Sequence, residues 1–164
     1  MNESLLPNVR AYASNRQLQI AESLGSGKDG MVWVGQSQTA PAKVALKAHR
    51  VAELYGRELA VYQRLKEGGI NTILGFNIPE LLGSDDRLRI LEMTIVRRPF
   101  VLDFAGAHLD TRPEFPAEVW ADWELDKREQ FEGSWKIVEK ILAAFEELGI
   151  YLLDVSPGNI AFLE

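Results

Sequence analysis

The sequence predicts an α+β protein in which a five-stranded antiparallel sheet with one packed helix is followed by a shortened helical lobe. Two observations predict this class. Short apolar segments separated by glycine-rich or polar turns recur in the first 95 residues, as is typical of hairpin-connected strands. Two longer segments carry apolar residues at steps of three and four, the spacing of one helix face. We therefore divide the chain into a sheet lobe, residues 1–95, and a partial helical lobe, residues 96–164.

The five expected strands follow a polar segment at the start of the chain. Residues 17–37 form two strands around a glycine-rich turn, and residues 42–50 form the third. Residues 78–83 and 87–96 supply the last two, with a polar Ser-Asp-Asp turn between them. Because strands that follow one another closely tend to pair, we expect one antiparallel sheet.

One helix is expected in the sheet lobe. In the helical lobe a long helix is expected after a charge-rich helical stretch with a solvated face at residues 122–132. In residues 51–66 the apolar side chains recur at helical spacing, and the glycines of Lys-Glu-Gly-Gly end the helix. Residues 97–116 are rich in proline, aspartate and glycine and are expected to be irregular. The helix that follows is stopped by Gly149. Its apolar stripe is formed by Trp135, Val138, Leu142, Phe145 and Leu148.

Composition and charge exclude several functional classes. The balance of 18 Lys+Arg against 24 Asp+Glu gives a net charge of −6, which disfavours nucleic acids and anionic membranes as partners. The sequence has no cysteine, so disulfides and thiolate chemistry are excluded. His49 and His108 lack a second ligand at metal spacing and are expected near the surface or the edge of the core. No apolar run approaches the roughly 20 residues of a membrane span and no signal peptide is recognised, so we expect a cytoplasmic protein.

The first chemical motif is the segment Gly25-Ser26-Gly27-Lys28-Asp29-Gly30-Met31-Val32, a G-x-G-x-x-G-x-V pattern. Glycines allow a backbone to turn sharply and to approach phosphates closely. The residues after the last glycine are β-branched and aromatic, which favours a second strand and not a helix. The pattern therefore indicates a glycine-rich loop between antiparallel strands, although an ordinary hairpin has the same signature.

The second motif pairs a strand lysine with a helix glutamate. Lys47 shares a strand face with Ala45, since side chains alternate along a strand. Glu58 lies on the apolar face of the helix in residues 51–66, where an unpaired carboxylate would cost several kcal/mol, about 3 to 5. We therefore predict an ion pair between Lys47 and Glu58. The alternatives are a surface lysine and a glutamate that reaches solvent at the rim.

These motifs, with the later segment Asp154-Val155-Ser156-Pro157-Gly158-Asn159, resemble the protein-kinase superfamily, including its small-molecule kinases. The features occur in the family's order and near its usual spacing. The resemblance implies ATP and Mg²⁺ as cofactors. It places Gly25, Gly27 and Gly30 over the phosphates and pairs Lys47 with both the phosphates and Glu58.

The resemblance also implies an adenine pocket and a catalytic loop. Val32 and Ala45 would enclose the adenine, and Leu91 would lie at the back of the pocket. The hinge backbone that hydrogen-bonds the adenine would come from Glu92, Met93 and Thr94. Asp154 would be the catalytic base and Asn159 a magnesium ligand.

The sequence departs from this pattern in two places. Leu152 and Leu153 stand where the family has His and Arg, which makes regulation by activation-loop phosphorylation unexpected. The family's D-F-G aspartate, a second metal ligand, is expected after Asn159, and none occurs before the sequence ends. We therefore expect the site to lack that carboxylate.

Three interpretations follow from the missing segment. The protein is a minimal ATP-dependent phosphotransferase, or a catalytically silent nucleotide-binding pseudokinase or interaction module, or part of a longer kinase. Whether it is an enzyme stays open on sequence alone. Because the helices that usually cover the stripe of residues 135–148 follow the catalytic loop, we also expect an exposed stripe and a homodimer or a partner chain.

Overall fold

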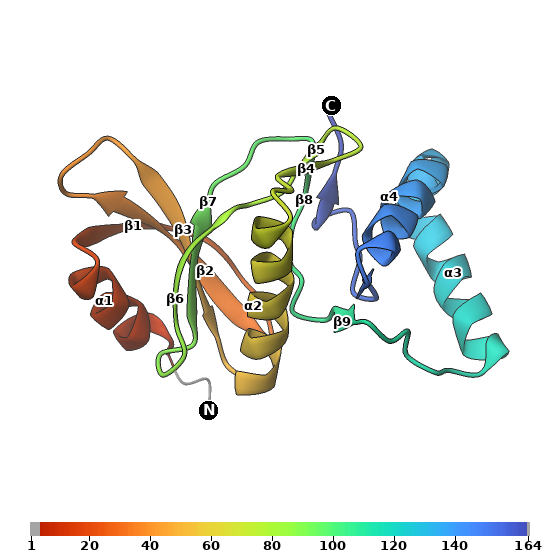
Figure 1. Ribbon diagram of the computed structural model, residues 1–164, viewed down its shortest axis with the longest axis horizontal. Coiled ribbons are helices and arrows are strands. Elements are labelled where there is room, and N and C mark those ends of the chain that lie inside the picture. The colour runs from red at the N-terminus through yellow and green to blue at the C-terminus, as the bar shows by residue number, and fades with distance from the viewer. Residues whose placement is uncertain (1–3, 164) are drawn as a thin grey trace.

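A computed structural model of the protein describes residues 4–163, and its largest element is a five-stranded sheet (Figure 1). The strands are β1 (Leu18–Ser26), β2 (Gly30–Ser37), β3 (Lys43–His49), β6 (Leu81–Asp85) and β7 (Ile90–Thr94). Their order is β1-β2-β3-β7-β6, and every neighbouring pair is antiparallel. The predicted α+β class and its five-stranded antiparallel sheet are therefore confirmed.

Helix α2 (Ala52–Glu67) packs on one face of this sheet, where a helix was expected. It buries Tyr55, Glu58, Val61, Tyr62 and Leu65. The end of the helix is a Schellman motif. Gly69 has φ +66°, its N–H donates to Lys66 O at 3.0 Å, and the N–H of Ile70 donates to Leu65 O at 2.9 Å. Glycine is favoured at Gly69 because that backbone conformation strains other residues.

Helix α1 (Leu6–Asn15) covers the opposite face of the sheet and corrects the prediction of one packed helix after a polar lead (Figure 1). Its Val9, Tyr12 and Ala13 are buried against a cluster that includes Leu46 and Ile90. The helix is short, with three buried positions among polar ones, so its own periodicity is weak. Contact with the sheet, more than intrinsic propensity, stabilises such a helix.

Very short strands pair parts of residues 72–109 with one another and with residues 150–161. β4 (Thr72–Ile73), β5 (Phe76–Asn77), β8 (Phe100–Val101) and β11 (Ile160–Ala161) form a second sheet in the order β11-β8-β5-β4. β9 (His108–Leu109) pairs with β10 (Ile150–Tyr151). Residues 97–116, expected to be irregular, thus contain two strands. Their pairing places residues 100–109 beside residues 150–161.

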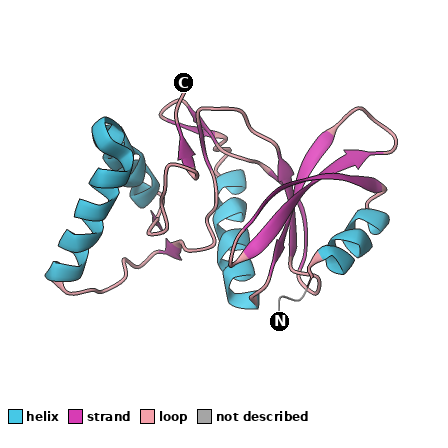
Figure 2. Cartoon of the chain, turned by 180° about the vertical axis from the view of Figure 1, so that it is seen from behind, coloured by secondary structure: helices cyan, strands magenta, loops and turns pink. Residues whose placement is uncertain are grey.

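The helical region contains two helices joined by a short 3₁₀ turn. α3 (Ala117–Phe131) is followed by Glu132–Ser134 and then by α4 (Trp135–Glu147). Figure 2, which views the chain from behind, shows both helices at the end of the molecule away from α1. Gly149, at φ +74°, follows the end of α4 as predicted.

The apolar stripe of α4 is buried within this chain, which corrects the expectation that it is exposed. Val138 and Phe145 have no exposed surface and Trp135 is 6% exposed. Leu142 and Leu148 are partly buried against the same core. At about 1.5 to 3 kcal/mol for each fully buried side chain, this burial is a large contribution to folding. The stripe therefore gives no reason to expect a dimer.

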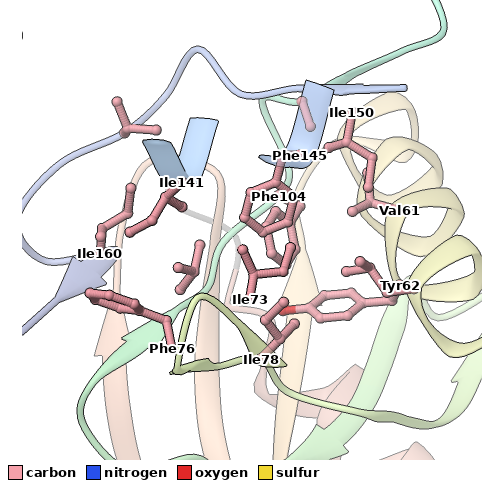
Figure 3. Packing of buried hydrophobic residues seen from close by; sticks show 14 of the residues in the cluster. Val61, Tyr62, Ile73, Phe76, Ile78, Phe104, Ile141, Phe145, Ile150 and Ile160 are labelled. Atoms are coloured by element: carbon pink, nitrogen blue, oxygen red, sulfur yellow. The ribbon is translucent and has the colours of Figure 1, made fainter. Parts of the chain in front are cut away.

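One continuous core connects the sheet lobe to α4 across the expected boundary at residues 95 and 96 (Figure 3). In its centre the Phe104 ring lies 5.1 Å from the ring of Tyr62 on α2 and 5.6 Å from that of Phe145 on α4. Ile150 and Ile160 close the core from the last strands. Among residues 4–163, no helix has the length and apolar character needed to cross a bilayer.

Candidate active site

A cleft of about 500 Å³ opens under the β1–β2 hairpin and brings together the chemical motifs of both lobes. Its walls include the glycine loop, Lys47 of β3, and Asp154 with Asn159 of the catalytic-loop-like segment. The full set of lining residues is Leu24, Gly25, Ser26, Gly27, Lys28, Asp29, Gly30, Val32, Lys47, Tyr62, Pro79, Met93, Leu102, Asp103, Asp154 and Asn159. Most of the predicted site residues therefore share one cavity, although they come from distant parts of the sequence.

The glycine loop is the tight end of the β1–β2 hairpin, closed by a hydrogen bond of 2.9 Å from Gly27 N to Gly30 O. At Gly30 a Cβ would collide with the carbonyl oxygen of Ala48 on β3, so packing alone requires glycine there. At Gly25 and Gly27 a Cβ would meet no atom within 4 Å, and neither has a positive φ. Nothing within the described chain requires glycine at these two positions, and both border the open cleft.

The predicted ion pair between Lys47 and Glu58 is confirmed. Lys47 Nζ lies 2.8 Å from Glu58 Oε1, and the Glu58 side chain has no exposed surface. His49 Nε2 is 2.7 Å from the same oxygen, and the N–H of Phe104 donates to Oε2 at 2.6 Å. Because an ionised carboxylate only accepts hydrogen bonds, His49 donates through Nε2. The burial of Glu58 is thus compensated by two side chains and one backbone group.

The histidine in this cluster lies deeper than the sequence indicated. His49 is fully buried, which corrects its expected place at the surface or core edge. Its Nδ1 lies 3.2 Å from Arg89 O, and its ring contacts Tyr55 edge-on at 5.5 Å between centroids. His49 therefore contacts, from within the core, the same carboxylate oxygen of Glu58 that Lys47 contacts.

The charges of this cluster stabilise one another. Burial by itself raises the pKa of Glu58, but the charge of Lys47 and the hydrogen bond from His49 outweigh it and lower the pKa to about 2. Burial by itself lowers the pKa of Lys47, but the charges of Glu58 and Asp103 outweigh it and raise the pKa. Both side chains are therefore charged over the physiological range.

Asp103 brings a second carboxylate into the cleft that Asp154 lines. It lines the cleft, and its Oδ1 lies 3.0 Å from Lys47 Nζ. Its backbone adopts φ +71°, and the next residue, Phe104, donates its N–H to Glu58. Lys47 thus bridges two carboxylates, one behind it in the core and one in the cleft. No aspartate follows Asn159, as the sequence shows, but the cleft holds a carboxylate besides Asp154.

Strand pairing brings Asp103 into the site although it precedes the catalytic-loop-like segment in the sequence. Ile160 pairs with Val101 and Ala161 with Phe100, antiparallel, and Leu102 N donates to Asn159 O at 2.9 Å. The sequence signal was the segment Leu102-Asp103-Phe104-Ala105-Gly106, which contains an Asp-Phe pair and a nearby glycine. It was overlooked because that motif was expected only after Asn159.

Asp154 and Asn159 lie on a compact turn beside Asp103. Asn159 Nδ2 donates to Asp154 O at 3.4 Å, and Asn159 N donates to Ser156 O at 2.9 Å. A Cβ on Gly106 would lie 2.9 Å from Asp154 Cβ, so the segment after Asp103 packs closely against Asp154. Asp154 itself is exposed and faces the cleft, where it can contact a bound ligand.

Only some of the residues that were expected to enclose an adenine line the cleft. Val32 and Met93 line the cleft, but Ala45 and Leu91 are buried and do not line it. Glu92 lies in the ladders with both β3 and β6, and its side chain points to α1.

The hinge prediction for Glu92 and Thr94 therefore needs correction. Thr94 N donates to Glu80 O at 2.9 Å, so this N–H is already used within the sheet. Glu92, in the middle of the two ladders, likewise has no backbone edge turned to the cleft. Of the three expected hinge residues, Met93 alone lines the cleft.

The oxygen atoms of the side chains at the cleft fit a hard divalent cation whose remaining ligands come from a phosphate. Asp103 and Asn159 both line the cleft and provide carboxylate and carboxamide oxygens, the ligands that Mg²⁺ prefers. Across the described residues, no group of three or more His, Cys, Asp or Glu forms a metal cluster of its own. Mg²⁺ commonly binds through one or two protein oxygens, and phosphate and water complete its coordination shell. Two protein ligands without a larger metal cluster are therefore compatible with Mg²⁺ binding.

The chain was also compared with known proteins. No protein-family model matches it, and no curated protein matches it. The assignment of this site therefore depends on its geometry: a glycine loop, a doubly paired lysine and three polar side chains around one cleft.

Proposed function

We propose that this protein binds ATP with Mg²⁺ in the cleft and transfers the terminal phosphoryl group to a hydroxyl acceptor, as protein-kinase-like enzymes do. The observation that carries the proposal is Lys47, held between Glu58 at 2.8 Å and Asp103 at 3.0 Å under the glycine loop. An ammonium fixed in this way by core and cleft carboxylates is placed to contact phosphate oxygens.

Three further polar residues of the cleft have roles in the proposed chemistry. Mg²⁺, when bound with ATP, would neutralise phosphate charge, and Asp103 and Asn159 would hold it. Asp154, exposed in the same cleft, would orient an acceptor hydroxyl and accept its proton. Gly25 and Gly27 leave space for phosphates against the hairpin backbone.

The second candidate function is a nucleotide-binding protein without catalysis. Leu152 and Leu153 favour it, because they provide no polar group beside Asp154 at the positions where kinases have His and Arg. The expected lack of a second carboxylate was the stronger argument for a silent site. Asp103 weakens that argument, because it places a carboxylate oxygen 3.0 Å from Lys47 Nζ. We therefore favour the enzyme.

Calorimetric titration with ATP, with and without Mg²⁺, tests the proposal together with an assay for ADP release. We expect magnesium-dependent binding, abolished in Lys47→Met and retained in Lys140→Met, a matched change at an exposed position of α4. Asp154→Asn should retain binding and lose turnover by orders of magnitude, since it acts on the acceptor.

Three results separate the possibilities. Wild-type protein that shows no ATP binding would contradict the proposal as a whole. Binding without turnover, in the presence of varied hydroxyl acceptors, would favour the silent alternative. Circular dichroism of Lys47→Met distinguishes a lost contact from a lost fold.

A further inference from the structure

Lys28 lies at the tip of the β1–β2 hairpin, between Gly27 and Gly30, and lines the cleft. It is exposed. Within residues 4–163 its side chain makes no hydrogen bond or ion pair. A lysine that faces a cavity without a protein partner is available to a ligand.

The charges of the cleft favour contact between Lys28 and an anionic ligand. Among the described lining residues the cations are Lys28 and Lys47, and the anions are Asp29, Asp103 and Asp154. Lys47 already has two carboxylate partners, at 2.8 and 3.0 Å. These lining residues carry a net charge of −1. When the charge of a bound triphosphate is added, one Mg²⁺ offsets the negative charge only in part.

The hairpin that carries Lys28 is built to approach a ligand. β1 is an edge strand whose second half is exposed, and its register with β2 shifts between Ile20 and Ser23 and again between Ser23 and Gly25. Gly25 and Gly27 have open space around them. Arg50 N donates to Asp29 O at 3.0 Å and holds the β2 side of the tip, whereas few contacts hold the β1 side. The Lys28 side of the tip can therefore make a small movement toward the cleft floor, where Lys47 lies.

We propose that Lys28 is a phosphate-binding residue that closes on the nucleotide from above while Lys47 contacts it from below. This inference depends on the proposed nucleotide site and extends it to ligand choice. Two cations on opposite sides of the phosphate chain favour binding of a nucleoside triphosphate over the corresponding nucleoside. The contribution of Lys28, the outer cation, depends on its charge more than on the shape of its side chain.

The test compares ATP, ADP and adenosine on wild type, Lys28→Ala and Lys28→Arg by calorimetry at low and moderate salt. Lys43→Ala is the matched control, because Lys43 is an exposed lysine of the adjacent strand outside the cleft. We expect Lys28→Ala to weaken ATP binding about tenfold, leave adenosine binding unchanged, and reduce the salt dependence of ATP binding. Lys28→Arg should retain most of the affinity.

The outcomes distinguish this inference from the proposed function. If Lys28→Ala binds ATP as wild type does while Lys47→Met does not, the role of Lys28 is refuted and the ATP site stands. If Lys28→Ala loses adenosine and ATP equally, the loop shape and not the charge matters, which also refutes it. If wild type binds no nucleotide, both proposals fail.

Discussion

The two walls of the cleft are built in different ways. The wall that carries the glycine loop and Lys47 consists of long strands, β1 to β3, joined in order by hairpins. The wall that carries Asp103 and Asn159 consists of two-residue strands, β8 and β11, which come from distant segments and pair through Val101 and Ile160. The first wall is locally determined, whereas the second depends on the core around Phe104 and Phe145.

This difference shows where a substitution disturbs the geometry of the site most. Lys47 is the point where the walls meet, since it contacts Glu58 of α2 and Asp103 of the second wall. Phe104, which follows Asp103, donates its N–H to Glu58 and inserts its ring into the core between Tyr62 and Phe145. The position of Asp103 thus depends on contacts that unite both halves of the molecule.

The largest expected effect comes from the second wall. Asp103→Asn keeps the shape of the side chain but removes its charge, so we expect turnover to fall on the order of a thousandfold, because preorganised charge at the reacting phosphates is lost. Asp122→Asn, at an exposed position of α3, is the matched control and should retain wild-type turnover.

The measurement is ADP release at saturating ATP and Mg²⁺, with thermal unfolding recorded for both variants. Equal turnover in Asp103→Asn and wild type would show that the second wall does not take part in the chemistry. The cleft would then depend on its first wall alone.

A smaller effect is expected on the free energy of unfolding when Glu58 is changed, since Glu58 pairs with Lys47 where the two walls meet. Glu58 has a pKa of about 2 in the folded protein against 4.5 as its ordinary value. Because the folded pKa is lowered, its contribution is fully present above pH 4.5 and is lost as pH falls toward 2. At 1.36 kcal/mol per unit, the shift corresponds to about 3 kcal/mol of unfolding free energy.

Urea unfolding of wild type and Glu58→Gln between pH 7 and pH 3 measures this contribution. We expect the variant to be less stable at pH 7 and the difference to shrink as pH falls. Glu147→Gln, at an exposed position of α4, provides the control. A constant difference at all pH values would mean that Glu58 stabilises the junction by packing and not by its charge.

The smallest expected effect is on the far face of the sheet, where α1 packs away from the cleft. Tyr12 of α1 donates to Glu92 Oε1 at 3.0 Å, and Arg16 Nε donates to the same oxygen at 3.0 Å. Burial raises the pKa of Tyr12, as does the charge of Glu92, so the hydroxyl stays protonated and keeps donating. Tyr12→Phe should cost about 1 kcal/mol of stability, since Arg16 still satisfies the carboxylate.

Urea unfolding at neutral pH tests this change beside Tyr151→Phe, for which the described chain shows no side-chain hydrogen bond. ATP binding should be unchanged, because α1 and the cleft lie on opposite faces of the sheet. A loss of ATP affinity in Tyr12→Phe would mean that α1 controls the cleft through Glu92.

The sequence could predict the elements whose signals are local. Hairpin-joined strands alternate visibly, and α2 carries an apolar face that ends at glycines. The pair of Lys47 and Glu58 was also predictable, because a carboxylate on a core-facing position requires a cation. Helix α1 was not, since its short stripe becomes stable only when Val9 and Tyr12 pack on the sheet.

Tertiary structure alone decided the rest of the site. A two-residue strand has no periodicity to recognise, so the pairing of β8 with β11 could not be deduced, and with it the position of Asp103. The burial of the α4 stripe was decided in the same way, by segments distant in sequence that fold over it. The sequence therefore determined which residues can do chemistry at the first wall, whereas the three-dimensional core determined which carboxylate faces Lys47.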